Sequence, residues 1–211
     1  MLILKRSNSV RSMQEKYIKP LLNHFESRGA VLSDTHNEII GAAFQYRKLR
    51  KNQYILQAGD VARYETYVLK GLLRTYLVDE KGQEHIMKFS IEDWWAGDLY
   101  SYYTNKPTSY NIDCLEETEV LQIAREDLEK LQTEIPGLNH YYQLLYRNSV
   151  IAFNKRVAAS LCNTATERYI EFIERYPEID QRVPNHQIAS YLGIAPASLS
   201  RIRGQYFRSG R

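Results

Sequence analysis

Cysteine is scarce in this sequence, because its 211 residues include only Cys114 and Cys162. The two lie far apart and form no Cys-x-x-Cys pair, so they exclude a cysteine-held iron–sulfur cluster and a disulfide framework. The five histidines are scattered as well, without the close pair on one strand that a cupin-type metal site needs. We therefore expect reduced thiols, no metal and no cofactor.

Motifs of known enzymes are missing too. There is no Gly-x-Ser-x-Gly elbow, no P-loop and no local Ser-His-Asp or Cys-His arrangement. No apolar run could span a membrane, and residues 1–10, MLILKRSNSV, have too few apolar residues before the first charge for a signal-peptide core. These absences predict a cytoplasmic protein that is not an enzyme and has no membrane partner.

Acidic residues are absent from residues 182–211, which contain five arginines. The preceding residues 164–181 are net acidic, and the net charge of the whole chain is only +3. A basic block on an otherwise near-neutral chain is typical of a nucleic-acid-binding segment. The alternative is a solvated basic tail.

Residues 183–206, VPNHQIASYLGIAPASLSRIRGQY, predict two short helices joined by a tight turn. Gly193 suits the left-handed residue that ends the first helix, and Pro196 suits the first turn of the second. The apolar side chains that could form one small core are Ile188, Leu192, Ile194, Leu199 and Ile202. Spacing alone also fits an ordinary helical hairpin.

Four side chains of the second helix, Ala197, Ser198, Arg201 and Gln205, are then expected to point outward. Small side chains allow close approach to DNA, and an arginine can donate two hydrogen bonds to O6 and N7 of guanine. This face therefore suits a DNA-recognition helix.

The N-terminal part predicts two helices, over residues 13–27 and 33–44, with Ser33 as the N-cap of the second. From Tyr46 onward, short apolar runs alternate with turn residues, which favours antiparallel strands in a sandwich or barrel. The expected strands are residues 54–56, 64–69, 72–78, 85–89, 110–114 and 119–123. The turn Asp79-Glu80-Lys81-Gly82 indicates a hairpin.

After a short helix over residues 125–131, residues 138–162 contain no glycine or proline and predict one long helix. Six side chains near a heptad spacing predict a dimerisation stripe: Leu138, Tyr142, Leu145, Ser149, Ala152 and Arg156. A second stripe of Leu144, Ile151, Val157 and Leu161 could face the β-domain. The alternative is a helix buried within one monomer. Thr164 and Glu167 form a capping box that starts the next helix.

This order of elements resembles the Crp/Fnr superfamily of bacterial transcription regulators, in the divergent branch common in Bacteroidetes-type bacteria. The resemblance rests on QIASYLGIAPASLSRIR at residues 187–203, on the long helix and on the glycines Gly59, Gly71, Gly82 and Gly97. It implies an α+β chain in three parts. These are a cyclic-nucleotide-binding-like antiparallel β-roll with N-terminal helices (1–136), a dimerisation helix (137–162) and a helix-turn-helix domain (163–211).

In cyclic-nucleotide-binding members of this family, a Gly-Glu pair binds the ribose and a later Arg-Ser pair binds the phosphate. The corresponding residues here are Gly97-Asp98 and Thr108-Ser109. The missing arginine would have paired with the cyclic phosphate, so the resemblance does not extend to cyclic AMP as the effector. The resemblance makes these four residues and Tyr110 the expected effector pocket.

Two other sensing modes of the family also find little support in the sequence. The redox-sensing members use clustered N-terminal cysteines, which are missing here. A haem would need an axial ligand, and His85 on a predicted strand is more typical of a surface or core residue.

The resemblance implies double-stranded DNA as a partner, a homodimer, a small-molecule effector and RNA polymerase as a further candidate partner. Arg201 is the expected base-contacting residue, and Ser198 and Ser200 could donate to phosphate or base edges. The residues expected to contact phosphate are Asn185, His186, Gln187, Arg203, Arg208 and Arg211.

The sequence thus predicts a dimeric DNA-binding transcription regulator and leaves the identity of the effector open. One alternative is a regulator whose pocket is vestigial, so that it needs no effector. The other is a cupin-like small-molecule-binding protein or enzyme with a C-terminus that merely packs.

Overall fold

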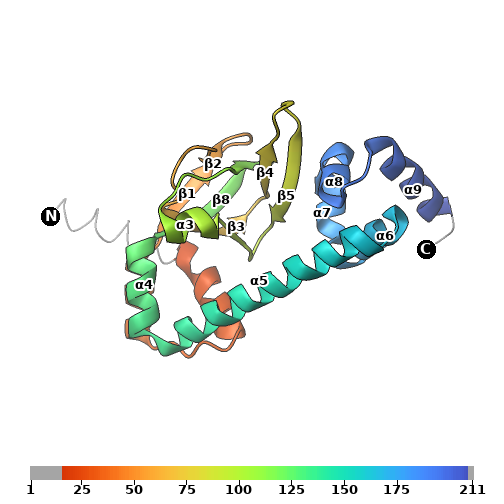
Figure 1. Cartoon of the computed structure of the whole chain (residues 1–211). Coiled ribbons are helices and arrows are strands. Elements are labelled where there is room, and N and C mark those ends of the chain that lie inside the picture. Colours follow the sequence, from red (N-terminus) through yellow and green to blue (C-terminus); the bar gives the residue numbers. More distant parts are fainter. Residues whose placement is uncertain (1–15, 209–211) are drawn as a thin grey trace. The chain divides into compact units, whose positions relative to one another are not determined.

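The computed structural model describes residues 16–208 (Figure 1). The described residues form two compact units, one of residues 16–73 with Ser90–Tyr146 and one of Arg74–Phe89 with residues 147–208. The boundary between them falls inside the longest helix.

Between residues 16 and 208, eight strands form two four-stranded sheets. The strands are β1 (Gln45–Leu49), β2 (Tyr54–Leu56), β3 (Tyr64–Lys70), β4 (Leu73–Val78), β5 (Glu84–Ser90), β6 (Trp95–Ala96), β7 (Asn111–Cys114) and β8 (Thr118–Ala124). Their orders are β1-β8-β3-β6 and β2-β7-β4-β5. All six predicted strands are confirmed within one or two residues of their ends, whereas β1 and β6 were not predicted.

The antiparallel pairing of β3 with β8 brings residues of distant sequence onto one surface. Thr66 lies opposite Gln122, and the register shifts between Val68 and Lys70. The tight turn between β3 and β4 needs Gly71, whose φ is 101°. A Cβ at this position would lie 2.7 Å from the carbonyl oxygen of Glu117, which leaves no room for any other residue.

Apolar side chains of the strands form one buried core, which contains Leu49, Val68, Leu73, Ala96, Ile112, Cys114 and Val120. The expected antiparallel β-roll in an α+β chain is therefore confirmed.

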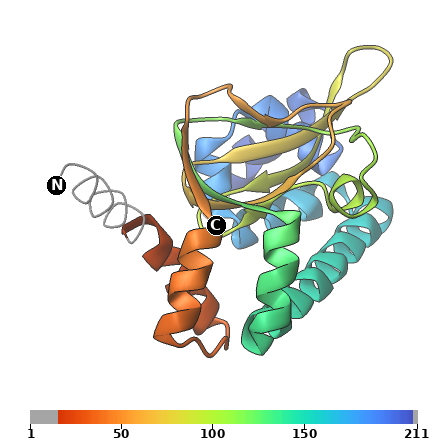
Figure 2. The same ribbon diagram turned by 90° about the vertical axis from the view of Figure 1, so that its left-hand side faces the viewer.

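Helices cover one end of these strands. Residues 16–27 are helical, and the predicted residues 13–15 of this helix lie outside the described part. The others are α2 (Asp34–Ala43), α3 (Leu99–Thr104), α4 (Arg125–Glu134) and α5 (Pro136–Cys162). Figure 2 shows α2 and α4 side by side below the strands, where they pack together. Ser33 caps α2 as predicted, because its hydroxyl accepts from the backbone N–H of His36.

A core rich in aromatic side chains joins these helices to the strands. It contains Phe25, Tyr67, Trp95, Tyr102, Leu138, Tyr141 and Tyr142 among others. The rings of Phe25 and Tyr141 meet edge-on with centroids 4.8 Å apart. The first two turns of α5 are therefore part of this core.

The second unit contains four shorter helices: α6 (Ala165–Arg175), α7 (Pro177–Arg182), α8 (Asn185–Leu192) and α9 (Pro196–Arg208). The capping box at the start of α6 is confirmed. The Thr164 hydroxyl accepts from the Glu167 N–H at 3.3 Å, and the Glu167 carboxylate accepts from the Thr164 N–H at 2.7 Å. The helix α7 was not predicted.

Candidate DNA-binding face and ligand cavity

The helices α8 and α9 form the predicted helix-turn-helix. Gly193 ends α8 in the left-handed conformation, with φ 65° and ψ 39°, and Pro196 begins α9. The buried side chains are Ile188 on α8 and Leu199 and Ile202 on α9. Burial of one face of each helix fixes which face remains exposed.

The opposite face of α9 is exposed. Ala197, Arg201 and Gln205 follow each other at steps of four residues, and Arg208 continues the row. The side chain of Arg201 makes no hydrogen bond or ion pair with any other residue between 16 and 208. Its guanidinium therefore keeps all of its donors for an external acceptor.

Asn185 and Ser200 form hydrogen bonds within the helix-turn-helix. The Asn185 side-chain amide donates to the Pro196 carbonyl at 3.3 Å and to the Ser200 hydroxyl at 3.1 Å. The Ser200 hydroxyl donates to the same carbonyl at 3.1 Å. Asn185 and Ser200 thus join the start of α8 to the start of α9.

The other two residues expected to contact phosphate at the start of α8, His186 and Gln187, differ in their exposure to solvent. Gln187 is buried, with 8% of its surface exposed, whereas His186 is exposed. Ser198 is half-buried. An external phosphate could therefore reach His186 but not the side chain of Gln187.

Arg203 was expected to contact phosphate, and the structure places its guanidinium elsewhere. It donates to the Asp180 carboxylate, to the Asp180 carbonyl at 3.2 Å and to the Tyr169 hydroxyl at 3.1 Å. Burial opposes the charge of Arg203, but the bonds to Asp180 and Tyr169 outweigh it, so the pKa of Arg203 is raised. This side chain joins α9 to α7 and α6.

Arg208 and Arg211 complete the set of expected phosphate contacts. Arg208 is exposed in the last turn of α9, and its Nε donates to the Gly204 carbonyl at 2.8 Å. Arg211 lies outside the described residues. Of the eleven residues expected to contact DNA, Asn185, Ser200 and Arg203 bond to other helices of the protein, and Gln187 is buried.

The predicted effector pocket is closed by its own side chains. The Thr108 hydroxyl donates to the Asp98 carboxylate at 2.6 Å, and both residues are buried. Asp98 also caps α3 by accepting from the Tyr100 N–H at 3.0 Å. The Tyr110 N–H donates to the Thr108 hydroxyl at 3.0 Å. Asp98 and Thr108 therefore satisfy each other where the family resemblance implied a sugar and a phosphate.

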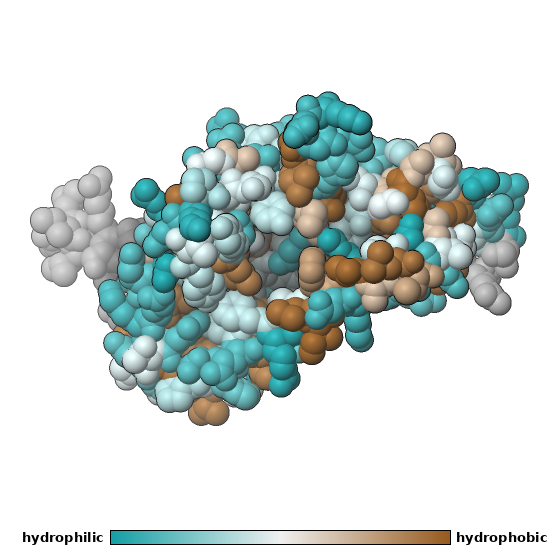
Figure 3. Space-filling view, viewed as in Figure 1, coloured by the Kyte–Doolittle hydropathy of each residue, from teal (hydrophilic) through white to brown (hydrophobic). Residues whose placement is uncertain are grey.

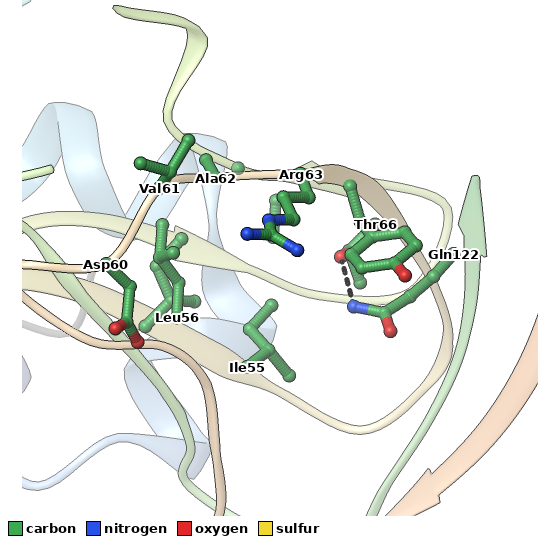
Figure 4. A pocket seen from close by; sticks show the side chains of 12 residues that line it. Ile55, Leu56, Asp60, Val61, Ala62, Arg63, Thr66 and Gln122 are labelled. Carbon is green, nitrogen blue, oxygen red and sulfur yellow. Dashed lines mark hydrogen bonds between the residues drawn. The ribbon is translucent and has the colours of Figure 1, made fainter. Parts of the chain in front are cut away.

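A cavity of about 290 Å³ lies among the strands of the β-roll. It is lined by Ile55, Leu56, Asp60, Val61, Ala62, Arg63, Tyr64, Thr66, Ala96, Gly97, Ile112 and Gln122. Figure 4 shows its lining side chains with Arg63 among them. Of the five residues expected in the pocket, Gly97 lines this cavity, whereas Asp98, Thr108, Ser109 and Tyr110 do not.

The polar wall of this cavity is a hydrogen-bonded pair from neighbouring strands. Gln122 on β8 donates from Nε2 to the Thr66 hydroxyl on β3 at 3.0 Å (Figure 4), and its Oε1 accepts from Arg47 at 2.8 Å. Sequence analysis missed these residues and Arg63. The pairing of Thr66 with Gln122 could have been found only from the register of β3 on β8.

Part of the dimerisation stripe predicted on the long helix α5 packs against the protein's own residues. Leu138 and Tyr142 are buried in the aromatic core because residues 16–27 pack on that side of the helix. The Arg156 guanidinium donates to the carbonyl of Met87. Leu145 packs against the same core, so four predicted members contact the protein's own residues, whereas Ser149 is exposed.

Other apolar side chains of α5 are exposed instead. Val150, Phe153, Val157 and Leu161 are 40–80% exposed and recur at steps of three and four residues, which makes one stripe. Ile151, 47% exposed, lies beside it. Figure 3 shows hydrophobic side chains gathered along α5. The second stripe of the sequence analysis thus contributes Val157 and Leu161 to this exposed surface.

The hairpin of β4 and β5 contacts α8 within the second unit. The Ser190 hydroxyl donates to the Glu84 carbonyl at 3.1 Å and accepts from the Ile86 N–H at 3.0 Å. The rings of Phe89 and Tyr191 lie 5.5 Å apart. The helix-turn-helix is therefore bound to a β-hairpin through backbone groups.

No metal site or membrane span is found in the described part of the chain. Between residues 16 and 208, no group of three His, Cys, Asp or Glu side chains could hold a metal ion. His85 contacts the Asp79 carboxylate at 2.8 Å, which holds the pKa of Asp79 below its ordinary value. No helix in the same range is long and apolar enough to cross a bilayer.

Comparison with known proteins identifies the relatives of this chain. Residues 46–134 match the cyclic nucleotide-binding domain family. The regulatory protein HlyX of Actinobacillus pleuropneumoniae is 24% identical over 177 residues, which cover 78% of this chain and 72% of HlyX. The fumarate and nitrate reduction regulatory protein of Vibrio cholerae is 24% identical over 176 residues, which cover 77% and 69%.

The solved structure of FixK2 from Bradyrhizobium japonicum has the same fold. Its TM-score is 0.68 at 19% identity, and the match covers 79% of this chain and 86% of FixK2. These relatives favour a regulator over the cupin-like alternative. The β-roll with its family match, the long helix, the helix-turn-helix and the similar regulators together support a transcription regulator of the Crp/Fnr superfamily.

Proposed function

We propose that this protein binds specific sequences of double-stranded DNA as a homodimer, with α9 as the recognition helix and Arg201 as the main base-contacting residue. The single observation that carries the proposal is the exposed Arg201, which makes no bond to any residue in 16–208 on a face of small and polar side chains. Arginine pairs with guanine in the major groove through two parallel hydrogen bonds.

The three arginines of α9 support different roles. Arg203 is engaged by Asp180 and Tyr169 and so positions α9 on its supporting helices. Arg208 is exposed at the end of α9 and needs only its charge to contact phosphate. Arg201 is left for the base edges, with Ala197 and Gln205 beside it.

The homodimer is proposed on the exposed apolar stripe of α5. The stripe consists of Val150, Phe153, Val157 and Leu161. Exposure of these apolar side chains to water is unfavourable, and packing them against a second copy of the chain would lower the free energy. This stripe replaces the one expected from the sequence, because Leu138 and Tyr142 are buried inside one chain. The β-roll, the long helix and the helix-turn-helix region would then serve as sensing, dimerisation and DNA-binding parts.

The proposed effector is not a cyclic nucleotide. A cyclic phosphate would need a cation where Thr108 stands, and Thr108 instead donates to the Asp98 carboxylate. Binding would require breaking this buried bond and placing a phosphate next to a carboxylate.

The test of DNA binding starts from a site selected out of a random DNA pool by the purified protein. The affinity of Arg201→Ala for this site and its single-base variants is then measured by fluorescence anisotropy. We expect a loss of about 1–3 kcal/mol and a relaxed preference at one base position.

Arg208→Ala is the matched control. It should weaken binding to all sequences alike and lower the dependence of affinity on salt. Equal losses on all sequences for Arg201→Ala would contradict its assigned role. Full-affinity binding by protein freed of small molecules would favour the effector-independent alternative.

A further inference from the structure

We propose that the cavity lined by Arg63, Thr66 and Gln122 binds a small organic monoanion, a carboxylate with a short apolar body. The inference rests on the proposed function, because it names the class of effector that the β-roll would sense. The site lies outside the closed Asp98–Thr108 pair.

The positive charge of the site comes from Arg63, the residue before β3. Its side chain reaches the cavity, and Figure 4 shows the guanidinium above Ile55 and to one side of Thr66. Arg63 makes no hydrogen bond or ion pair with any other residue in 16–208. A guanidinium in this position can donate two parallel hydrogen bonds to one carboxylate.

The buried polar groups beside Arg63 have donors left to offer. The Thr66 hydroxyl accepts from Gln122, so its own proton is available, and Gln122 has a second Nε2–H. The Gln122 carbonyl oxygen is already occupied by Arg47. This corner of the cavity therefore presents hydrogen-bond donors, which suits a head group that only accepts.

The remaining walls suit an apolar body of limited size. Ile55, Leu56, Val61 and Ile112 contribute aliphatic surface. A volume of about 290 Å³ is at the lower end of ligand pockets and holds roughly ten water-sized groups. A short aliphatic or single-ring carboxylate fits this space.

A second negative charge would be disfavoured by Asp60, an acidic residue that also lines the cavity. The neighbouring hollow of about 750 Å³, which shares Arg63, is less suited to an anion. It is lined by Glu126 and Glu129, and its second cation, Arg125, is already bonded to Glu129 at 2.8 Å. The charge arrangement therefore favours a monoanion in the smaller cavity.

The test uses three probes of equal chain length: hexanoate, its neutral amide hexanamide, and the dianion adipate. Binding to the full chain is measured by isothermal titration calorimetry. Hexanoate should bind saturably, and hexanamide and adipate should each bind about 10-fold more weakly or worse.

Arg63→Gln should weaken hexanoate about 10-fold or more and leave hexanamide unchanged, because it removes only the charged hydrogen bonds. Thr66→Val should also weaken hexanoate, through loss of its hydroxyl donor. Arg50→Gln, which changes another exposed arginine away from the cavity, is the matched control and should bind like the unmodified chain. Because Arg63 is exposed, Arg63→Gln should leave the melting temperature unchanged.

Three outcomes would overturn the inference: no saturable hexanoate binding in the millimolar range, equal binding of hexanoate and hexanamide, or unchanged hexanoate binding by Arg63→Gln. DNA binding is measured separately, with the selected site. If the cavity binds no anion, the effect of Arg201→Ala on DNA binding can still be interpreted. If the protein binds no DNA, the calorimetric result on anion binding can still be interpreted.

Discussion

Arg201 and Arg203 are two positions apart on α9 and have opposite environments. Residues at this spacing point to nearly opposite sides of a helix. Arg201 is exposed, whereas Arg203 donates to Asp180 and Tyr169. The helical period was enough to predict that Arg201 points outward.

The role of Arg203 could not be predicted in the same way. Its partner Asp180 lies on α7, a helix of six residues with no side-chain N-cap, which the sequence pattern did not indicate. The bonds of Asn185 to Pro196 and Ser200 could not be predicted for a related reason, since they depend on how α8 and α9 meet. Side-chain roles that depend on a tertiary contact cannot be inferred from spacing alone.

His24 is a residue whose protonation should affect stability. Its Nε2 lies 3.0 Å from the Tyr141 hydroxyl, which accepts from Trp95 at 2.8 Å. Burial lowers the pKa of His24 below the ordinary 6.5, Asp93 opposes this effect, and Arg28 adds to it. The folded protein therefore favours neutral imidazole, as an acceptor for Tyr141.

Because the unfolded chain protonates His24 at a higher pH than the folded one, the stabilisation is complete above about pH 6.5. It is lost as the pH falls below that value and through the folded pKa. We expect the free energy of unfolding, from urea titrations between about pH 5 and pH 8, to fall toward acid. His24→Gln should show a smaller fall, and an unchanged slope would exclude His24 as its source.

At the scale of elements, α5 carries more than one apolar stripe in its sequence. The heptad pattern indicated a long helix correctly, but it could not tell which stripe meets the chain's own core. Packing of residues 16–27 on the first turns of α5 decides this, because it buries Leu138 and Tyr142. The stripe left over is the one with Val150, Phe153, Val157 and Leu161.

Val157→Glu should therefore weaken dimerisation by about 10-fold or more, since it places a charge in an apolar contact. The association state is measured by analytical ultracentrifugation as a function of concentration. Lys155→Glu places the same carboxylate on the opposite side of α5 and is the control. If both substitutions act equally, or neither acts, the exposed stripe is not the dimer contact.

The elements that escaped prediction are short. β6 has two residues, and α3 has six residues rich in tyrosine, a residue that favours strands. α3 forms because Asp98 caps its first turn and Asn105 ends it in the left-handed conformation. Arg63, Thr66 and Gln122 meet only through strand pairing, so the cavity could not be predicted from local patterns.

At the scale of the whole molecule, the order of parts was the most predictable property. Two helices, a hairpin-rich β-region, a long helix and a helix-turn-helix follow one another in the sequence as they do in the structure. Each part has a distinct period of apolar residues, and such periods depend on neighbours close in the chain. The boundary between the two compact units lies inside α5, where the sequence shows no change in the period of its apolar residues.

A symmetric dimer of this chain should bind a near-palindrome whose half-sites are centred about 10 bp, or one DNA turn, apart. We expect insertion of about 5 bp between the half-sites to abolish tight binding, because it rotates one half-site to the far side of the duplex. Anisotropy titrations on both DNAs test this. Equal affinity for the two would indicate that single subunits bind independently.

The hydrogen bond between Thr108 and Asp98 has a consequence for signalling specificity. A carboxylate and a hydroxyl of the chain bond to each other where the family resemblance implies the sugar and the phosphate of a cyclic nucleotide. On the proposed function, we expect changes in cyclic nucleotide concentration to leave the state of this protein unaltered. A regulator that does not respond to cyclic nucleotides could evolve specificity for a different effector while it keeps the same fold.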